Sequence, residues 1–207
     1  MELGAIMMII GRSASSRKTG QSGFSLLEVM FAMVVLAIGM LATLASLGIT
    51  IGANETSQED MIARQLASEA MESIFNARNT SQLGFSSINN VGVGAGIFLV
   101  TPQSPKCPGP DGILGTADDT GCTAANGTAC PIECLSEPGP DGIMGTADDG
   151  ILALSNFTRT IAIQQLLDGN NNPIPTLVQV TITINYTVPN HGGTKSYVLD
   201  EYISSYH

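Results

Sequence analysis

The longest apolar stretch of the chain lies near its N-terminus. Residues 29–53 contain neither a charged residue nor a proline, and Glu28 is the one ionisable residue between Phe24 and Ala53. A helix of about 20 apolar residues is long enough to cross a bilayer. The pattern therefore predicts a membrane-spanning helix over residues 24–53.

The helical pattern continues beyond the apolar stretch. No proline follows Ala53 until after residue 100, and the sequence becomes polar on one side only. Apolar positions recur at helical spacing: Ile62, Leu66, Ala70 and Ile74, flanked by Ala63, Ala67 and Met71. We expect one helix from Phe24 to about Asn79, roughly 84 Å long at 1.5 Å per residue, whose amphipathic part, residues 54–79, packs on a folded domain.

Alternation of apolar and polar residues predicts strands in the last third of the chain. Residues 178–188 alternate with a period of two, which indicates a sheet with one buried face. Residues 157–163 alternate as well, residues 168–175 form turns, and residues 197–203 supply a last strand. A short strand is also expected at residues 97–100. We therefore predict an α+β fold in which the long helix covers a small antiparallel sheet.

Composition and charge narrow the range of functions. The 207 residues include 8 Lys and Arg against 18 Asp and Glu, a net charge of −10. The scattered bases form no cationic surface, so no nucleic-acid partner is expected. The sequence contains no Gly-x-Ser-x-Gly, no His-Glu-x-x-His and no phosphate-binding loop, and His191 lies in an expected turn. We expect no enzyme and no catalytic residue.

Basic residues set the expected orientation in the membrane. Arg12, Arg17 and Lys18 precede the apolar stretch, and the next base is Arg64. The positive-inside rule then leaves the N-terminus in the cytoplasm and exports the residues after about 53. We expect a single-pass inner-membrane protein with a cytoplasmic N-terminus and an exported domain at residues 80–207.

The segment GFSLLEV at residues 23–29 follows a short basic leader and precedes the apolar helix. It resembles the class III signal of type IV pilins and of type II secretion pseudopilins. The resemblance implies removal of the leader 1–23 by a prepilin peptidase after Gly23, N-methylation of Phe24, and retention of the helix in a pilin fold. Met1, Met7 and Met8 all remain possible starts.

Glu28 stands alone in an apolar helix, where a carboxylate costs roughly 2.5–3.5 kcal/mol at the bilayer centre. It is the fifth residue after the cleavage site and lies about one helical turn from the new α-amino group. The resemblance implies that this glutamate sets the register of an incoming subunit against the terminal amine of its neighbour during assembly. The alternative is a carboxylate that reaches water at the membrane surface.

A second resemblance concerns the amphipathic half of the helix. Residues 65–72 (QLASEAME) and the pair Arg78 and Asn79 are similar to the minor pilins of the type IV pilus modification group, and less closely to small type II pseudopilins. The implied partners are other pilins, the prepilin peptidase and the inner-membrane assembly machinery.

An acidic insert at residues 107–150 contains a repeat. Residues 108–119 (PGPDGILGTADD) recur at 138–149 with eleven of twelve positions identical, and the insert carries eight acids and no base. Such Asp/Gly loops supply oxygen ligands to Ca²⁺; the candidate carboxylates are Asp111, Asp118, Asp119, Asp141, Asp148 and Asp149. The spacing matches no established calcium motif, and a pair of solvated Pro-Asp-Gly turns is the alternative.

Four cysteines lie in the same insert: Cys107, Cys122, Cys130 and Cys134. Export to an oxidising compartment favours two disulfides. Cys107 and Cys122 bracket the first repeat, so we favour that pair together with Cys130–Cys134. Zinc is the alternative, but the spacing lacks the paired Cys-x₂-Cys of zinc knuckles, and His191 and His207 are the only histidines.

Three functional hypotheses follow. The first is a minor pilin, a structural subunit of a type IV pilus that contributes to filament initiation, assembly or adhesion. The second is a pseudopilin in a periplasmic type II secretion pseudopilus. The third is a calcium-dependent adhesive module carried on a pilin-type helix. The exposed acidic insert favours surface display.

Overall fold

The computed structural model describes residues 25–188 and 193–206. Helix α1 (Leu26–Asn79) is continuous over 54 residues and ends where the sequence predicts. The expected start at Phe24 lies outside the described residues. The chain divides into two compact units, residues 1–47 and 48–207, with the boundary inside α1.

The part of α1 in the first unit has the character of a membrane span. Every described side chain from Ser25 to Leu47 is exposed, and the helix is long and apolar enough to cross a bilayer. Apolar side chains exposed over this length are stable in lipid rather than in water. The structure thus agrees with the predicted membrane helix in length and composition.

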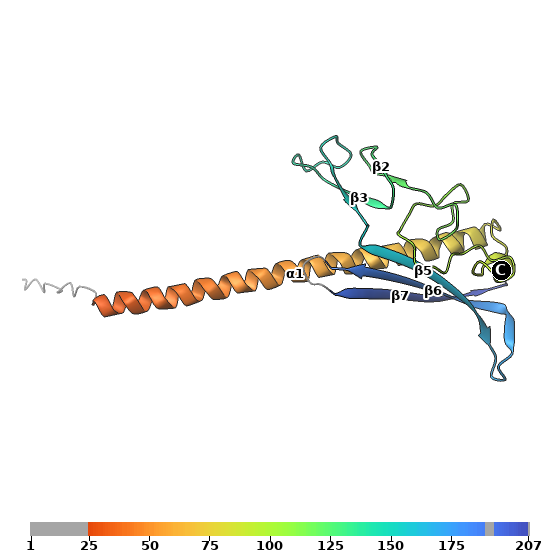
Figure 1. The fold of residues 1–207 in the computed structure, drawn as a ribbon, viewed down its shortest axis with the longest axis horizontal. Helices are drawn as coiled ribbons and strands as arrows, with labels where there is room; N and C mark the ends of the chain where they lie inside the picture. Colours follow the sequence, from red (N-terminus) through yellow and green to blue (C-terminus); the bar gives the residue numbers. More distant parts are fainter. Residues whose placement is uncertain (1–24, 189–192, 207) are drawn as a thin grey trace, which may run out of the picture. The chain divides into compact units, whose positions relative to one another are not determined.

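A three-stranded antiparallel sheet forms the body of the second unit (Figure 1). Its strands β5 (Phe157–Leu167), β6 (Pro173–Thr187) and β7 (Thr194–Ser204) lie in the order β5-β6-β7. Ile161 faces Ile182, which in turn faces Leu199, so aliphatic side chains form a row across the sheet. Such cross-strand pairs stabilise a sheet.

The core lies between this sheet and the second half of α1. The predicted helix stripe is buried, with Leu66 1% and Ile74 0% exposed. Against it pack the inward side chains of the strands, including Ile161, Ile182 and Ile184, each at most 1% exposed. The predicted α+β arrangement, a long helix covering a small antiparallel sheet, is confirmed.

Two sequence expectations differ from the structure. Strand β6 begins at Pro173 rather than near residue 178, because Pro173 pairs with Leu167 of β5. Strand β7 pairs with β6 only from Leu177 onward. The first residues of β6 therefore have one free edge, where a proline costs no hydrogen bond. The strand expected at residues 97–100 is wrong: Phe98 makes one isolated bridge to Asn90, and its ring is 0% exposed.

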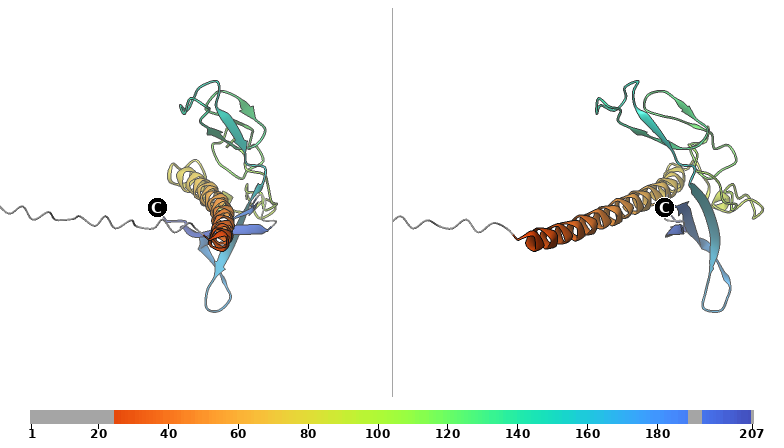
Figure 2. Two further views of the ribbon diagram at one scale, coloured as in Figure 1. Left: turned by 90° about the vertical axis from the view of Figure 1, so that its left-hand side faces the viewer. Right: turned by 60° about the vertical axis from the view of Figure 1, so that its left-hand side comes forward.

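The insert forms two small hairpins. Strands β1 (Cys122–Thr123) and β2 (Ala129–Cys130) make the first, and β3 (Cys134–Glu137) and β4 (Gly150–Ala153) make the second. A short 3₁₀ helix, η1 (Phe85–Ser87), follows α1. In the two views of Figure 2, the insert and the turn between β5 and β6 extend in opposite directions from the sheet.

Both disulfides favoured by the sequence are present. Cys107 is bonded to Cys122 and Cys130 to Cys134. The first bond closes the loop that contains the first repeat, and the second joins the end of β2 to the start of β3. Closing a loop of about 15 residues stabilises a folded chain by about 3 kcal/mol in the chain-entropy view. The disulfides therefore fix an insert that has few apolar residues of its own.

Candidate functional site

Glu28 lies in the first turn of α1. A carboxylate is favoured there because the helix dipole places partial positive charge at the N-terminus. Its side chain is exposed, and the apolar side chains that follow it, from Val29 to Leu36, are exposed as well. Gly23 and Phe24, the predicted cleavage and methylation residues, lie outside the described residues.

The two repeats form separate loops that have the same conformation. In the first, the Asp111 carboxylate accepts a hydrogen bond from the Ile113 amide at 2.8 Å, and the Asp119 carboxylate accepts one from the Gly115 amide at 2.8 Å. The second repeats these bonds thirty residues later: Ile143 N–H to Asp141 at 2.8 Å and Gly145 N–H to Asp149 at 2.6 Å. Carboxylates that accept nearby backbone amides close Asx-type turns.

A threonine holds the third carboxylate of each repeat. The Thr116 hydroxyl donates to Asp118 at 2.6 Å, and the Thr146 hydroxyl donates to Asp148 at 2.6 Å. These hydrogen bonds lower the pKa of both carboxyls, which are exposed. The six predicted acids therefore fix their own loops, three in each, and Asp119 also contacts Arg159 of β5.

The described residues contain no cluster of side chains that supports the calcium site predicted at these carboxylates. Within residues 25–188 and 193–206, no group of three or more His, Cys, Asp or Glu side chains is arranged to hold a metal ion. Calcium also binds backbone carbonyl oxygens, so calcium binding by the repeats stays a prediction. Calorimetry with Ca²⁺ tests it, since binding to the folded state raises stability.

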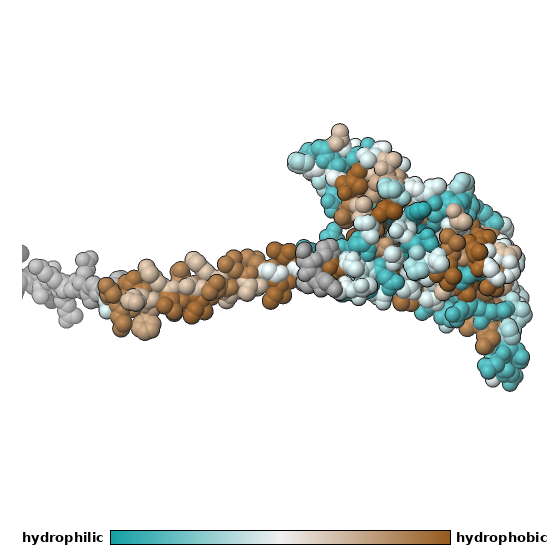
Figure 3. All heavy atoms as spheres, viewed as in Figure 1, coloured by the Kyte–Doolittle hydropathy of each residue, from teal (hydrophilic) through white to brown (hydrophobic). Residues whose placement is uncertain are grey.

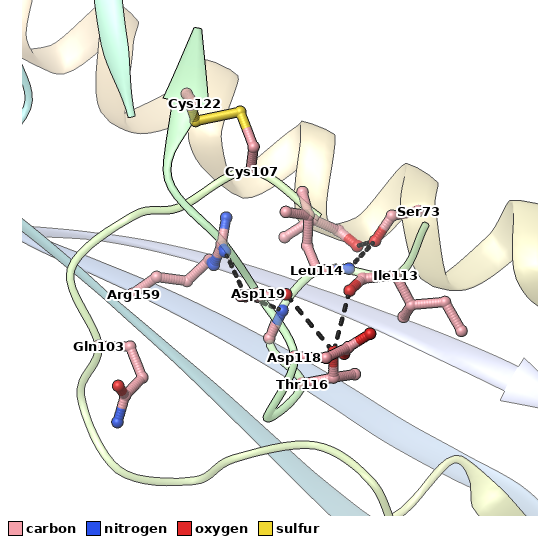
Figure 4. A network of polar contacts seen from close by, with 12 residues as sticks. Ser73, Gln103, Cys107, Ile113, Leu114, Thr116, Asp118, Asp119, Cys122 and Arg159 are labelled. Carbon is pink, nitrogen blue, oxygen red and sulfur yellow. Dashed lines mark hydrogen bonds and ion pairs between the residues drawn. A yellow bond between two sulfur atoms is a disulfide. The ribbon is translucent and has the colours of Figure 1, made fainter. Parts of the chain in front are cut away.

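A buried ion pair links the first repeat to the sheet (Figure 4). The Arg159 guanidinium of β5 lies 3.4 Å from the Asp119 carboxylate, and the two side chains are 2% and 10% exposed. The backbone of Arg159 also pairs with Gln103, through hydrogen bonds of 2.7 and 2.9 Å. Burial raises the pKa of Asp119, and the Gly115 amide and Arg159 oppose that rise. Removing one partner would leave the other charge buried without its counter-ion.

A pair of carboxyls, Glu133 and Glu69, lies where the insert meets α1. Glu133, between the bonded Cys130 and Cys134, lines the same surface hollow as Glu69 on the helix. Burial, followed by the neighbouring Glu69 charge, raises the pKa of Glu133 to about 7, although the charge of Arg159 opposes the rise. Burial and a neighbouring carboxylate both favour the neutral, protonated form of Glu133.

We expect this carboxyl pair to make stability depend on pH. The pKa of Glu133 is about 7 in the folded state, against an ordinary value of 4.5, so the folded chain binds the proton more tightly. The free energy of unfolding should then fall as pH rises from about 4.5 to about 7, and level off above. Glu133→Gln should raise the melting temperature at pH 8 and leave it unchanged at pH 5, as measured by circular dichroism of the full chain in detergent.

Glu137→Gln is the matched control for this experiment, because Glu137 is an exposed carboxylate on the neighbouring strand β3. It should retain the wild-type fall in stability between pH 4.5 and 7. A Glu133→Gln chain with the same pH dependence as wild type would contradict the assignment of the raised pKa to Glu133.

Three polar residues that make contacts inside the folded domain were not predicted from the sequence: Arg159, Asn90 and Glu133. Arg159 did leave a signal, because it occupies an inward position of an alternating strand, where an apolar residue is expected. Asn90 left none: its side-chain amide, 8% exposed, donates to Ile161 at 2.7 Å and accepts from the Ile163 amide at 2.8 Å. Glu133 also left none, since its partner Glu69 is brought near only by the fold.

Comparison with known proteins adds one match. Residues 18–44 match the family model described as the prokaryotic N-terminal methylation motif, the type IV pilin-type signal. No curated protein and no solved structure matches the chain significantly. The matched residues include Gly23, Phe24 and Glu28, and the match supports a pilin or pseudopilin family. The motif implies processing by a prepilin peptidase and assembly with other pilins, and it fits membrane anchoring before assembly.

Proposed function

We propose that this protein is a minor pilin, a structural subunit of a type IV pilus that contributes to filament initiation, assembly or adhesion. The observation that carries the proposal is the methylation motif at residues 18–44, which overlaps the exposed apolar part of α1. Behind it, the same helix continues into a domain with its own core. A subunit of this design is anchored in the membrane by its helix until it packs against other subunits.

Two further features favour a minor pilin. The helix segment at residues 65–72 resembles the pilus modification group, and it includes part of the buried stripe of α1. The acidic insert adds two hairpins and two disulfides beside the three-stranded sheet. Exposed loops on a rigid scaffold are typical places for recognition.

The alternative is a pseudopilin of a type II secretion system. The methylation motif favours it equally, because the motif serves both kinds of subunit. The two functions differ in location, since a pilin reaches the cell surface and a pseudopilin remains in the envelope.

Mass spectrometry of sheared surface filaments tests the proposal. We expect a peptide that begins at Phe24 with one added N-methyl group, which establishes cleavage after Gly23 and residence in a pilus. The same processed peptide confined to the envelope fraction would favour the pseudopilin. An uncleaved chain alone would contradict both functions.

A further inference from the structure

The two repeats have the same conformation, but the first is buried and the second is exposed to solvent. Their turns share equivalent hydrogen bonds, and Gly115 and Gly145 both have φ of +86°. In the first repeat, Ile113 and Leu114 are 3% and 2% exposed, whereas the equivalent Ile143 and Met144 are 60% and 53% exposed. One loop is therefore seated in the core and its copy presents the same apolar pair to solvent.

The surface that receives the first repeat is formed by α1 and β5. The Leu114 amide donates to the Ser73 hydroxyl of α1 at 3.2 Å (Figure 4). Gly115 lies directly against the Ile161 side chain of β5, where a Cβ atom would collide with it. We call this surface the seat. In it, Ser73 of α1 accepts a hydrogen bond from the loop, and Ile161 of β5 packs against the loop glycine.

The second repeat is placed to reach another molecule. It forms the loop of the β3–β4 hairpin, between Glu137 and Gly150, in the lobe at the top of Figure 3. Hydrogen bonds within the loop fix its shape, joined by one from the Asn126 side chain to the Asp149 carbonyl, so little conformational entropy is lost on binding. Exposed apolar side chains on an ordered loop mark sites of protein interaction.

We propose that the second repeat docks on a neighbouring pilin-type subunit, at a seat between helix and strand like the one that holds the first repeat in this chain. The inference rests on the proposed function, because filament assembly is what brings such a subunit alongside. The partner is a helix-on-sheet domain rather than a membrane, since Asp141 and Asp148 flank the apolar pair and are repelled by anionic lipid.

The one difference between the repeats fits this role. Leu114 in the buried copy is replaced by Met144 in the exposed copy. Leucine has well-defined rotamers that suit a fixed core, whereas methionine is flexible and adapts to varied surfaces. The exposed copy thus retains the shape of the loop and gains tolerance for a seat that is not identical to that of its own chain.

Photo-crosslinking in intact filaments identifies the partner. The full chain carries p-benzoylphenylalanine in place of Met144, and a matched chain carries it in place of Asn170, in the exposed turn between β5 and β6. We expect at least tenfold more adduct from position 144, joined to the exported domain of a chain that itself has a methylated N-terminal helix. Adduct no greater than at position 170, or adduct with lipid alone, would overturn the proposal.

A double variant provides an independent test. Ile143→Asp with Met144→Asp should leave the melting temperature and N-terminal processing unchanged, because both side chains are exposed, while the chain's content in sheared filaments falls at least fivefold. Ala147→Asp, an exposed position of the same loop, should assemble as wild type. If double variant and wild type occur equally in filaments, the docking inference fails alone; if wild type is absent from filaments, the proposed function fails with it.

Discussion

Replacement of Gly115 by alanine is expected to destabilise the domain by straining the backbone and overfilling the core. Gly115 has φ of +86°, and an added Cβ would overlap the δ-methyl of Ile161, a side chain that is 1% exposed. The left-handed backbone costs an L-residue roughly 1–2 kcal/mol and overfilling a packed core about 1–3, so the free energy of unfolding should fall by about 2–5 kcal/mol. Urea unfolding of the full chain in detergent, followed by circular dichroism, measures it.

Gly145→Ala is the control that isolates the steric contribution. Gly145 has the same φ of +86°, but nothing lies within 4 Å of the position of its Cβ. In Gly145→Ala the free energy of unfolding should therefore fall only by the cost of the left-handed backbone, roughly 1–2 kcal/mol. Equal losses for Gly115→Ala and Gly145→Ala would show that the first repeat is not seated against Ile161 in solution.

The second large effect is expected from Glu28→Ala. The substitution should leave membrane insertion and cleavage intact, because it makes an apolar helix more apolar. Incorporation into filaments should fall at least tenfold, since the carboxylate that is able to pair with the terminal amine of a neighbouring subunit is lost. Quantitative immunoblots of sheared filaments against the membrane fraction measure the ratio.

Two further variants separate charge from position in that experiment. Glu28→Gln retains the shape and hydrogen bonding of the side chain without its charge, and should behave like Glu28→Ala if charge pairing is what matters. Glu55→Ala removes a carboxylate from the same helix beyond the apolar stretch, and should assemble normally. Wild-type incorporation of Glu28→Ala would contradict a role of this residue in assembly.

The elements with strong periodicity were predicted well because a single physical requirement determines them. The helix ends at Asn79 as predicted, since its apolar stripe stops where the core stops. The alternating strands were found near their positions, but β6 extends further toward its N-terminus as far as Pro173. That extension depends on which edge of the strand is free, which is a property of the assembled sheet.

The different roles of the two repeats could not be predicted from their local sequence pattern. The acidic, glycine-rich composition of residues 107–150 predicted solvated loops or a metal site, and both interpretations treated the two copies as equivalent. In the structure Ile113 and Leu114 belong to the core, while Ile143 and Met144 do not. Two nearly identical sequences differ in burial here because burial is decided by the surface that each loop meets. Arg159 in β5 pairs with the first copy only.

Duplication of the loop has an evolutionary consequence. The first copy is constrained by the packing of Ile113 and Leu114 and by the Asp119–Arg159 pair, so most changes there reduce stability. The second copy keeps its shape through its own hydrogen bonds, and substitutions at positions 143 and 144 alter only exposed side chains. The chain therefore has a ready-folded surface on which new contacts can evolve without loss of the fold.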